Sequence, residues 1–287
     1  MDHAINSINP ATIKARLIRR GIISKRDGVL IHVYQPNLNR KNAEEIRSFK
    51  VNIPSELGIY ITLGVDLGDL YARTLAFTNA NPAITCKPLF YFKEEGVDYL
   101  GLEYFGIGNL DECLDQNIIS LSQANAAISQ IKESLAKTAA PSTYEAMHAE
   151  VQLLENEIST ISELSSYDRD FITTKLFPIV YQELKSLVPM TYWTNGDFIS
   201  RNIVVGENNV AKLIDYEFSH RTHSPELDYF RLKTFSPHSA HFDIPKLSQS
   251  ITLLGWLEHL VTSYKSQKLE PFAREYIHIA NNLIKSL

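Results

Sequence analysis

The sequence predicts an α+β protein of two lobes, a small strand-rich N-terminal lobe over residues 1–105 and a larger helical lobe over residues 106–287. Two observations lead to this prediction. Short runs rich in β-branched and aromatic residues are prominent in the first third of the chain. After Leu110 the pattern changes to helices, and in the last two of these apolar residues recur every three or four positions. With 287 residues, 44% of them hydrophobic and 21% charged, the chain is globular in composition and long enough to bury a substantial core.

The N-terminal lobe is expected to open with a helix over residues 11–20 and then to form a sheet. Turn-forming residues at 54–58 join two of its strands into a hairpin, and a short helix over 70–78 precedes the last two strands. The strands are predicted over 28–34, 48–51, 59–63, 89–92 and 99–104.

The C-terminal lobe is expected to consist mainly of amphipathic helices. Pro141 ends one of them, and Ser142 with Glu145 three residues later is typical of a capping box that opens the next. A small β-hairpin over 203–205 and 210–214 interrupts the helices. The helices are predicted over 118–139, from 144 onward, 168–187, 246–264 and 271–284.

Composition excludes several classes of protein. The formal charge of −5 argues against a nucleic-acid-binding protein, which is usually strongly basic. The chain has two cysteines, Cys86 and Cys113, which excludes a disulfide framework and favours the reducing cytoplasm. The first residues lack the pattern of a signal peptide. The most apolar run, 251–261, is too short and too polar for membrane insertion.

The most informative segment is Asn195–Asn202, followed about a dozen residues later by Asp215. Phosphoryl transfer requires a carboxylate that accepts the proton of the attacking hydroxyl and oxygen ligands that hold Mg²⁺ against the nucleotide phosphates. Asp197, Asn202 and Asp215 supply these groups. The hairpin between the last two would fold Asp215 back beside Asn202.

These residues resemble the aminoglycoside phosphotransferase and choline kinase family, which has a protein-kinase-like fold and the motifs H-G-D-x-x-x-x-N and I-D-x-E. The resemblance implies a phosphotransferase that uses ATP and Mg²⁺ and acts on a hydroxyl of a small molecule. It implies Asp197 as catalytic base and Asn202 and Asp215 as metal ligands. It also implies that residues 1–105 bind the nucleotide and that 106–287 carry the catalytic loop and the acceptor site. The alternative is an unrelated α/β protein in which the spacing arises by chance.

Three further residues are assigned supporting roles by the same resemblance. Asn195 stands where the family has histidine and can still hydrogen-bond to the backbone of the loop. Glu217 completes the I-D-x-E motif. Asp228 lies in a proline-then-aspartate segment that opens the next helix, and its role is structural.

The small lobe departs from the family pattern. Strand 60–65 has no nucleotide-binding lysine, helix 70–75 has no glutamate, and 37–46 contains no glycine of a phosphate-binding loop. Three explanations remain open: an incorrect alignment of this lobe, a replacement lysine at Lys50 on the preceding strand, or loss of nucleotide turnover. Lys50 resembles the displaced lysine of with-no-lysine protein kinases, although it could equally be a solvated strand residue.

Gly106-Ile107-Gly108 is a weak phosphate-binding signal by itself. Its place after strand 99–104 matches the hinge between the lobes in the family. On this interpretation backbone groups of Glu103, Tyr104 and Phe105 meet the edge of adenine. A plain turn is the alternative.

Other patterns carry less information. The pairs His220/His223 and His238/His241 have helical metal-ligand spacing but no supporting ligand cluster, so packing or surface roles are favoured. No G-x-S-x-G elbow indicates a serine-based catalytic triad. Trp193 and Tyr216, expected on strands beside the motif, are expected to pack in the core.

Two classes of function therefore remain. The first is a kinase for a small-molecule hydroxyl, with an aminoglycoside, a choline-like cation or a sugar as acceptor. The second is a pseudokinase module that binds a nucleotide or a partner without turnover. Acidic residues between 145 and 163 would suit a cationic acceptor, but their spacing is also that of a solvent-exposed helix face. The oligomeric state cannot be read from the sequence.

Overall fold

The structure, a computed structural model, describes residues 8–25, 28–34, 47–53, 58–162, 164–206 and 210–265. Its contacts divide the chain into two compact units, one formed by Met1–Ser134 with Arg201–Ser219 and the other by Leu135–Ser200 with His220–Leu287. The first is rich in strands and the second in helices, which confirms the α+β fold class. By packing, residues 106–134 belong with the first unit, so the functional division at residue 105 stays a prediction.

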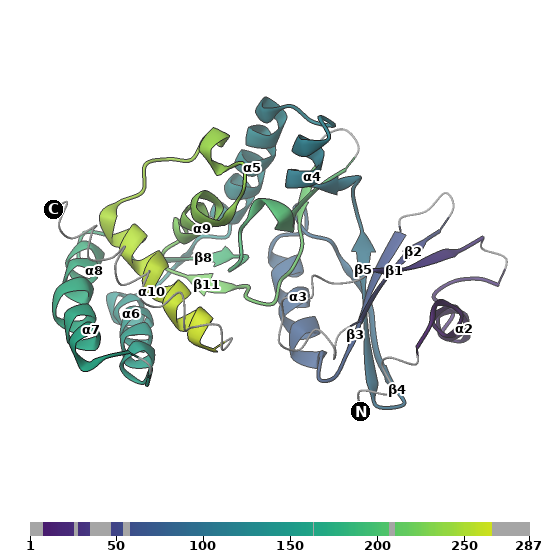
Figure 1. The fold of residues 1–287 in the computed structure, drawn as a ribbon, viewed down its shortest axis with the longest axis horizontal. Coiled ribbons are helices and arrows are strands. Elements are labelled where there is room, and N and C mark those ends of the chain that lie inside the picture. Colours follow the sequence, from purple (N-terminus) through teal and green to yellow (C-terminus); the bar gives the residue numbers. More distant parts are fainter. Residues whose placement is uncertain are drawn as a thin grey trace. The chain divides into compact units, whose positions relative to one another are not determined.

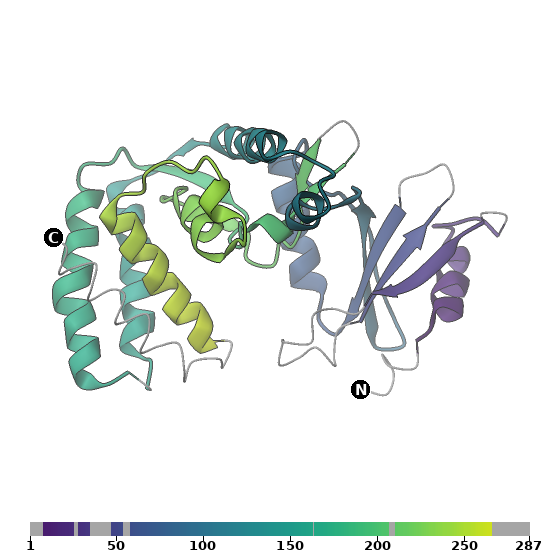
Figure 2. The ribbon, with the colours of Figure 1, turned by 45° about the horizontal axis from the view of Figure 1, so that its top comes forward.

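A five-stranded antiparallel sheet forms the body of the first unit, in the order β1-β2-β3-β5-β4. Helices α2 and α3 lie on opposite sides of this sheet (Figures 1 and 2). The elements are α2 (Pro10–Arg19), β1 (Leu30–Tyr34), β2 (Arg47–Asn52), β3 (Gly58–Gly64), α3 (Gly68–Ala80), β4 (Pro88–Glu94) and β5 (Val97–Tyr104). Each matches a helix or strand expected from the sequence.

Helix α2 covers one face of the sheet because its apolar stripe faces the strands. Asn9 caps the helix by accepting a hydrogen bond from the Thr12 amide at 3.0 Å, and Pro10 occupies its first turn. Ile13 and Leu17 are buried in one cluster with Phe49 of β2 and strand residues of β3 and β5. The central strands therefore carry the core of this unit.

The first unit is completed by a second sheet and two helices. Its strands are ordered β10-β9-β6, and β9 and β10 form the predicted hairpin. The elements are β6 (Gly108–Asn109), α4 (Leu110–Asp115), α5 (Leu121–Ala136), β9 (Ile203–Val205) and β10 (Ala211–Leu213). A capping box is present at α4, between Asn109 and Glu112.

The second unit combines a small sheet, in the order β11-β8-β7, with a group of helices. Its elements are β7 (Ala140–Pro141), α6 (Tyr144–Ser159), α7 (Ser166–Phe171), a π-helical turn (Ile172–Leu176), α8 (Phe177–Leu184), β8 (Met190–Thr194), a 3₁₀ turn (Ser200–Asn202) that crosses into the first unit, β11 (His220–Thr222), α9 (Leu227–Phe235), a 3₁₀ turn (Ser239–His241) and α10 (Gln249–Lys265).

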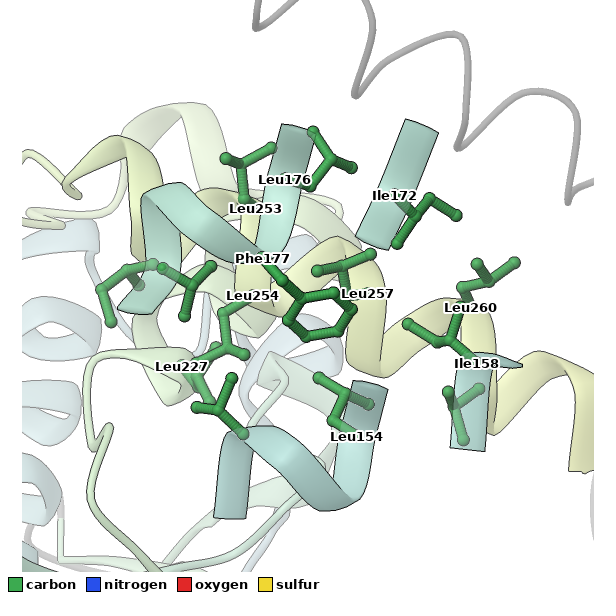
Figure 3. Close-up of a cluster of buried hydrophobic side chains, with 14 of the residues drawn as sticks. Leu154, Ile158, Ile172, Leu176, Phe177, Leu227, Leu253, Leu254, Leu257 and Leu260 are labelled. Carbon is green, nitrogen blue, oxygen red and sulfur yellow. The ribbon is translucent and has the colours of Figure 1, made fainter. Parts of the chain in front are cut away.

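Four helices enclose the core of the second unit. Phe177 of α8 is fully buried, and Figure 3 shows it surrounded by leucines of α6, α9 and α10. Leu154, Leu227 and Leu254 are among these neighbours. On α10 the buried Leu253, Leu254, Leu257 and Leu260 lie at three- and four-residue spacings, which is the pattern from which this helix was predicted.

Three expectations need correction. The predicted capping box of Ser142 and Glu145 is wrong, because Thr143 is the N-cap residue and accepts from the Ala146 amide at 3.1 Å. The helix predicted over 168–187 contains a π-helical turn just before Pro178, whose missing amide and bulky ring disfavour a regular α-turn. Tyr216 lies outside the strands, although it is buried as expected.

Some of the expected elements lie outside the described residues, namely the turn at 54–57, the stretch 37–46, the hairpin loop at 207–209 and the helix at 271–284. Among the helices that are described, none combines the length and hydropathy needed to cross a membrane.

We expect Phe177→Ala to lower the free energy of unfolding by about 3–5 kcal/mol, because the substitution leaves a cavity in the centre of the second unit. Urea denaturation measures this change. The matched control is Leu153→Ala on α6, whose leucine is 62% exposed and whose loss should cost at most about 0.5 kcal/mol. Equal losses in the two variants would contradict this description of the core.

Candidate active site

The loop that carries Asp197 belongs to the second unit and follows β8 directly. Gly196 adopts φ +77°, a left-handed conformation that favours glycine, and its amide donates to Thr194 Oγ1 at 3.0 Å. Asn195 is fully buried, as expected of a residue that supports the loop. The Ile199 amide donates to the carbonyl of Asp197 at 3.0 Å, which makes the loop turn tightly around Asp197.

Asp228 anchors this loop from helix α9. Its carboxylate is completely buried and accepts a hydrogen bond from Thr194 Oγ1, the same oxygen that receives the Gly196 amide. Arg231, one turn later, lies 3.7 Å from the carboxylate and offsets the cost of burying its charge. A chain of hydrogen bonds thus leads from Asp228 through Thr194 to the loop, which favours the structural role predicted for Asp228.

Hairpin β9–β10, in the first unit, carries the two predicted metal ligands at its open end. Leu213 pairs with Ile203, and the Ile214 amide extends the ladder by donating to the carbonyl of Asn202 at 2.9 Å. Asp215 follows Ile214 directly. The register therefore sets the backbone of Asp215 next to that of Asn202, as was predicted from the hairpin between them.

Asp215 has an unusual backbone conformation, with φ +60°. Only a few per cent of residues other than glycine adopt such a conformation, and aspartate tolerates it better than most. Backbone strain of this kind concentrates at functional sites. The backbone conformation of Asp215 thus favours a functional role for this residue, independently of its sequence motif.

The segment after Asp215 is fixed to helix α3. Arg73 Nη1 donates to the carbonyl of Glu217 at 2.8 Å, and the Tyr216 hydroxyl accepts from the Cys86 amide at 2.8 Å. Tyr216 also packs against Phe77, and burial raises its pKa well above the usual range. The sequence did not predict a role for Arg73. It indicated only that this helix lacks the glutamate of the family pattern.

Lys50 and Tyr104, two of the predicted nucleotide-binding residues, are in contact within the first unit. Lys50 Nζ donates to the Tyr104 hydroxyl at 3.2 Å and lies 4.7 Å from the centre of its ring. Lys50 is half-buried on β2. Its ammonium group is therefore held at the end of β5 that leads into the predicted hinge.

A buried ion pair that the sequence did not reveal lies beside the predicted hinge. Lys212 Nζ approaches both carboxylate oxygens of Glu103, at 2.9 and 3.0 Å, and lies 4.3 Å from the centre of the Phe105 ring. The side chains of Lys212 and Glu103 are 13% and 8% exposed. Strand β10 thus brings a lysine to the hinge from a position 109 residues away in the sequence, which no local pattern could have indicated.

The chain then leaves β5 through a glycine that its geometry requires. Gly106 has φ +100°, and a Cβ atom there would lie 2.6 Å from the carbonyl oxygen of Val205. The Ile107 amide donates to the same carbonyl at 2.8 Å, and Gly108 pairs with Val205 in the second sheet. Gly106-Ile107-Gly108 is therefore a close crossing over the β9–β10 hairpin.

Electrostatic interactions in the second unit also involve helix α10. Burial and the charge of Arg231 lower the pKa of His259, while the carboxylate of Asp197 opposes this shift. The imidazole of His259 packs at 4.5 Å, centre to centre, against the ring of Phe235. The carboxylate of Asp197 thus acts electrostatically on a neutral histidine of α10.

The histidine pairs do not form metal sites in the described part of the chain. His220 and His223 lie on and just after strand β11, not on a helix, and His223 bonds to Glu150 and Ser142. Within the described residues no group of three or more histidine, cysteine, aspartate or glutamate side chains could hold a metal ion. The structure sets the backbones of Asn202 and Asp215, the predicted metal ligands, next to each other, whereas Asp197 belongs to the other unit, and its approach to them stays a prediction.

We expect Lys212→Met and Glu103→Gln each to lower the free energy of unfolding by about 3–5 kcal/mol, because each leaves a buried charge or dipole without its partner. The double variant should lose less than the sum of the two, which a thermodynamic cycle from denaturation curves measures. Lys137→Met, at an exposed position, is the control. Additive losses would show that the two side chains do not stabilise one another.

The chain resembles known proteins in its fold rather than in its sequence. Neither a protein-family model nor a curated protein matches the sequence. Solved structures do match. A thermostable mutant of the aminoglycoside phosphotransferase APH(4)-Ia has a TM-score of 0.64 at 11% identity, covering 94% of this chain and 97% of that chain. Choline kinase LicA from Streptococcus pneumoniae has 0.58 at 15%, covering 95% and 98%.

A third match is the macrolide 2′-phosphotransferase MphH from Brachybacterium faecium, with a TM-score of 0.55 at 12% identity and coverage of 93% and 97%. Other matching structures hold ligands: one of APH(4)-Ia contains ADP and hygromycin B, and one of LicA contains AMP. The three matches cover 93–95% of this chain. The chain therefore has the protein-kinase-like fold of the aminoglycoside phosphotransferases and choline kinases, as its motifs indicated.

Proposed function

We propose that this protein is a phosphotransferase that uses ATP and Mg²⁺ to phosphorylate a hydroxyl group of a small molecule. The observation that carries the proposal is the open end of hairpin β9–β10, where Asn202 and the strained Asp215 lie next to each other. Asp197 comes five residues before Asn202, at the end of a loop that a buried aspartate anchors. The proteins that share the fold include phosphotransferases for three kinds of small molecule.

The donor set of the hairpin fits Mg²⁺. An amide oxygen of Asn202 and a carboxylate of Asp215 are hard ligands, and two protein ligands leave coordination positions for phosphate oxygens and water. When bound, the ion would neutralise charge on the phosphates during transfer. Asn202 and Asp215 would hold and orient the ion, whereas Asp197 would orient the acceptor hydroxyl and take its proton.

The nucleotide would be held by the first unit, with Lys50 in place of the lysine that β3 lacks. Lys50 is held by Tyr104 at the end of β5, and its ammonium group is the phosphate-binding cation in this proposal. Backbone groups of Glu103, Tyr104 and Phe105 meet the adenine edge. The Lys212–Glu103 ion pair supports this segment from β10.

The acceptor is a small molecule whose hydroxyl reaches Asp197. Two observations speak against a purely acidic acceptor site on α6. The carboxylate of Glu150 is bonded to Thr222 and His223, and that of Glu155 accepts from the Tyr181 hydroxyl at 2.8 Å. A sugar is therefore as good a candidate acceptor as an aminoglycoside or a choline-like cation. Since both cysteines are free, the proposal places the enzyme in the cytoplasm.

A pseudokinase that binds a nucleotide without turnover is the second candidate function. The observation in its favour is that β3 has no lysine and α3 no glutamate, so the usual ion pair between these elements is missing. Arg73 of α3 instead bonds to the backbone of Glu217.

We expect purified protein with Mg²⁺ and ATP to form ADP in the presence of the right acceptor from a panel of aminoglycosides, choline, macrolides and sugars. Asp197→Ala should reduce the rate at least about 100-fold, because the general base is lost. Chelation of Mg²⁺ should abolish turnover, since the ion that would neutralise charge on the phosphates during transfer is removed. Asp170→Ala, at an exposed position of α7, is the matched control and should keep full activity.

Two other results of this assay are informative. Nucleotide binding that depends on Mg²⁺ and Asp215, with no turnover on any acceptor, would support the pseudokinase. Full activity of Asp197→Ala would contradict the assignment of the base.

We expect Lys50→Ala to weaken ATP binding several-fold, because a cation that contacts the phosphates is removed, and isothermal titration calorimetry measures this change. Tyr104→Phe keeps the ammonium group but removes its hydrogen bond, so its effect should be smaller. Lys25→Ala, at an exposed position, is the control. An unchanged affinity of Lys50→Ala would exclude the replacement of the missing lysine by Lys50.

A further inference from the structure

Three side chains of the second unit form a continuous hydrogen-bonded relay that the proposed phosphotransferase does not use. Ser142 Oγ lies 2.8 Å from His223 Nε2, and His223 Nδ1 is hydrogen-bonded to the Glu150 carboxylate. We call these residues the Ser142–His223–Glu150 relay. They come from the segment before α6, the end of β11 and the middle of α6, so only the tertiary structure brings them together.

The carboxylate determines the tautomer of the imidazole. An ionised carboxylate can only accept hydrogen bonds, so in the neutral form of His223 the proton is on Nδ1. Nε2 is then the acceptor, and the hydroxyl of Ser142 donates to it. This arrangement of hydroxyl, imidazole and carboxylate is the one that activates a serine as a nucleophile.

The relay is held rigidly. Glu150 also accepts from Thr222 Oγ1 at 2.6 Å and from the His223 amide at 3.1 Å, which fixes the carboxylate relative to the imidazole. The amide of Ser142 donates to the carbonyl of Pro189 at 2.9 Å. The side chain of His223 is 7% exposed. Both the base and the backbone of the serine are therefore positioned before any ligand binds.

The surroundings of Ser142 suit an electrophile. Ser142 is half-buried rather than enclosed, and α6 begins two residues later. The positive end of the dipole of α6 favours a developing negative charge near Ser142, whereas the Ala146 amide of its first turn is already bonded to Thr143 Oγ1. Tyr144, in that first turn, is 51% exposed and offers an apolar surface to a substrate.

From the relay and its surroundings we infer that Ser142 is an activated nucleophile for acyl transfer from small carboxylic esters. Ser142 Oγ forms a bond to the ester carbonyl carbon while its proton passes to His223 Nε2. The bond to the leaving alcohol then breaks, and the alcohol takes that proton. Water, deprotonated by the same imidazole, attacks the acyl carbon; the bond between that carbon and Ser142 Oγ breaks, Oγ takes the proton back from His223 Nε2, and the carboxylic acid is released. Glu150 orients the imidazole and stabilises its charged form.

The test is to treat the purified protein with a fluorophosphonate and to locate the adduct by peptide mass spectrometry. We expect Ser142 to react about 100-fold faster than Ser186, an exposed serine that serves as the internal control. p-Nitrophenyl acetate should be hydrolysed in the absence of ATP, and Ser142→Ala should abolish this hydrolysis. These readouts use no nucleotide, so they succeed or fail independently of the proposed phosphotransferase.

His223→Gln tests the relay itself and should slow labelling of Ser142 about 100-fold, while Glu150→Gln should slow it less. Circular dichroism verifies that these variants fold, and the adduct map of the unaltered protein does not depend on their folding. Absence of an adduct on Ser142, labelling no faster than at Ser186, or an unchanged rate in folded His223→Gln would overturn the inference and leave the relay as a purely structural contact.

Discussion

The antiparallel ladder between β9 and β10 is the constraint on which the rest of the candidate site depends. A hairpin of three residues per strand would be only marginally stable by itself. It is stabilised by neighbours on both sides, since β6 pairs with β9 and the Leu213 amide donates to the carbonyl of Ile84 at 2.7 Å. Because the hairpin is held in this way, the residues at its open end have a fixed register, and Asp215 can adopt an unfavourable backbone conformation.

The same hairpin connects the proposed metal ligands to the predicted hinge. The open end of the hairpin carries the proposed metal ligands, while Lys212 within β10 forms the buried ion pair with Glu103 at the start of the predicted hinge. Buried pairs of this kind contribute little net stability, but they strongly disfavour any register that would separate the charges. The ion pair thus specifies how β10 meets β5, and with it the position of Asp215.

In the second unit, the carboxylates of two side chains hold a loop and a strand in place through hydrogen bonds. Asp228 fixes the Asp197 loop through Thr194, and Glu150 fixes β11 through Thr222 and His223. Both carboxylates accept a hydrogen bond from a threonine hydroxyl of the segment that they hold. Glu150 is linked through His223 to the hydroxyl of Ser142, and this link supports the separate chemistry inferred for that serine. Asp228 instead holds the loop of the proposed phosphotransferase.

The sequence by itself determined the fold class and most elements, because hydrophobic periodicity and turn residues are local signals, as α2, the strands of the large sheet and α10 show. It also determined the spacing of Asp197, Asn202 and Asp215 along the chain. Only the tertiary structure decided the pairs that are distant in sequence, such as Lys212 with Glu103 and Ser142 with His223. The physical reason is that side-chain partners are chosen by packing: Ser142 seemed to be a helix cap because its neighbours allow one, yet a histidine 81 residues away binds its hydroxyl instead.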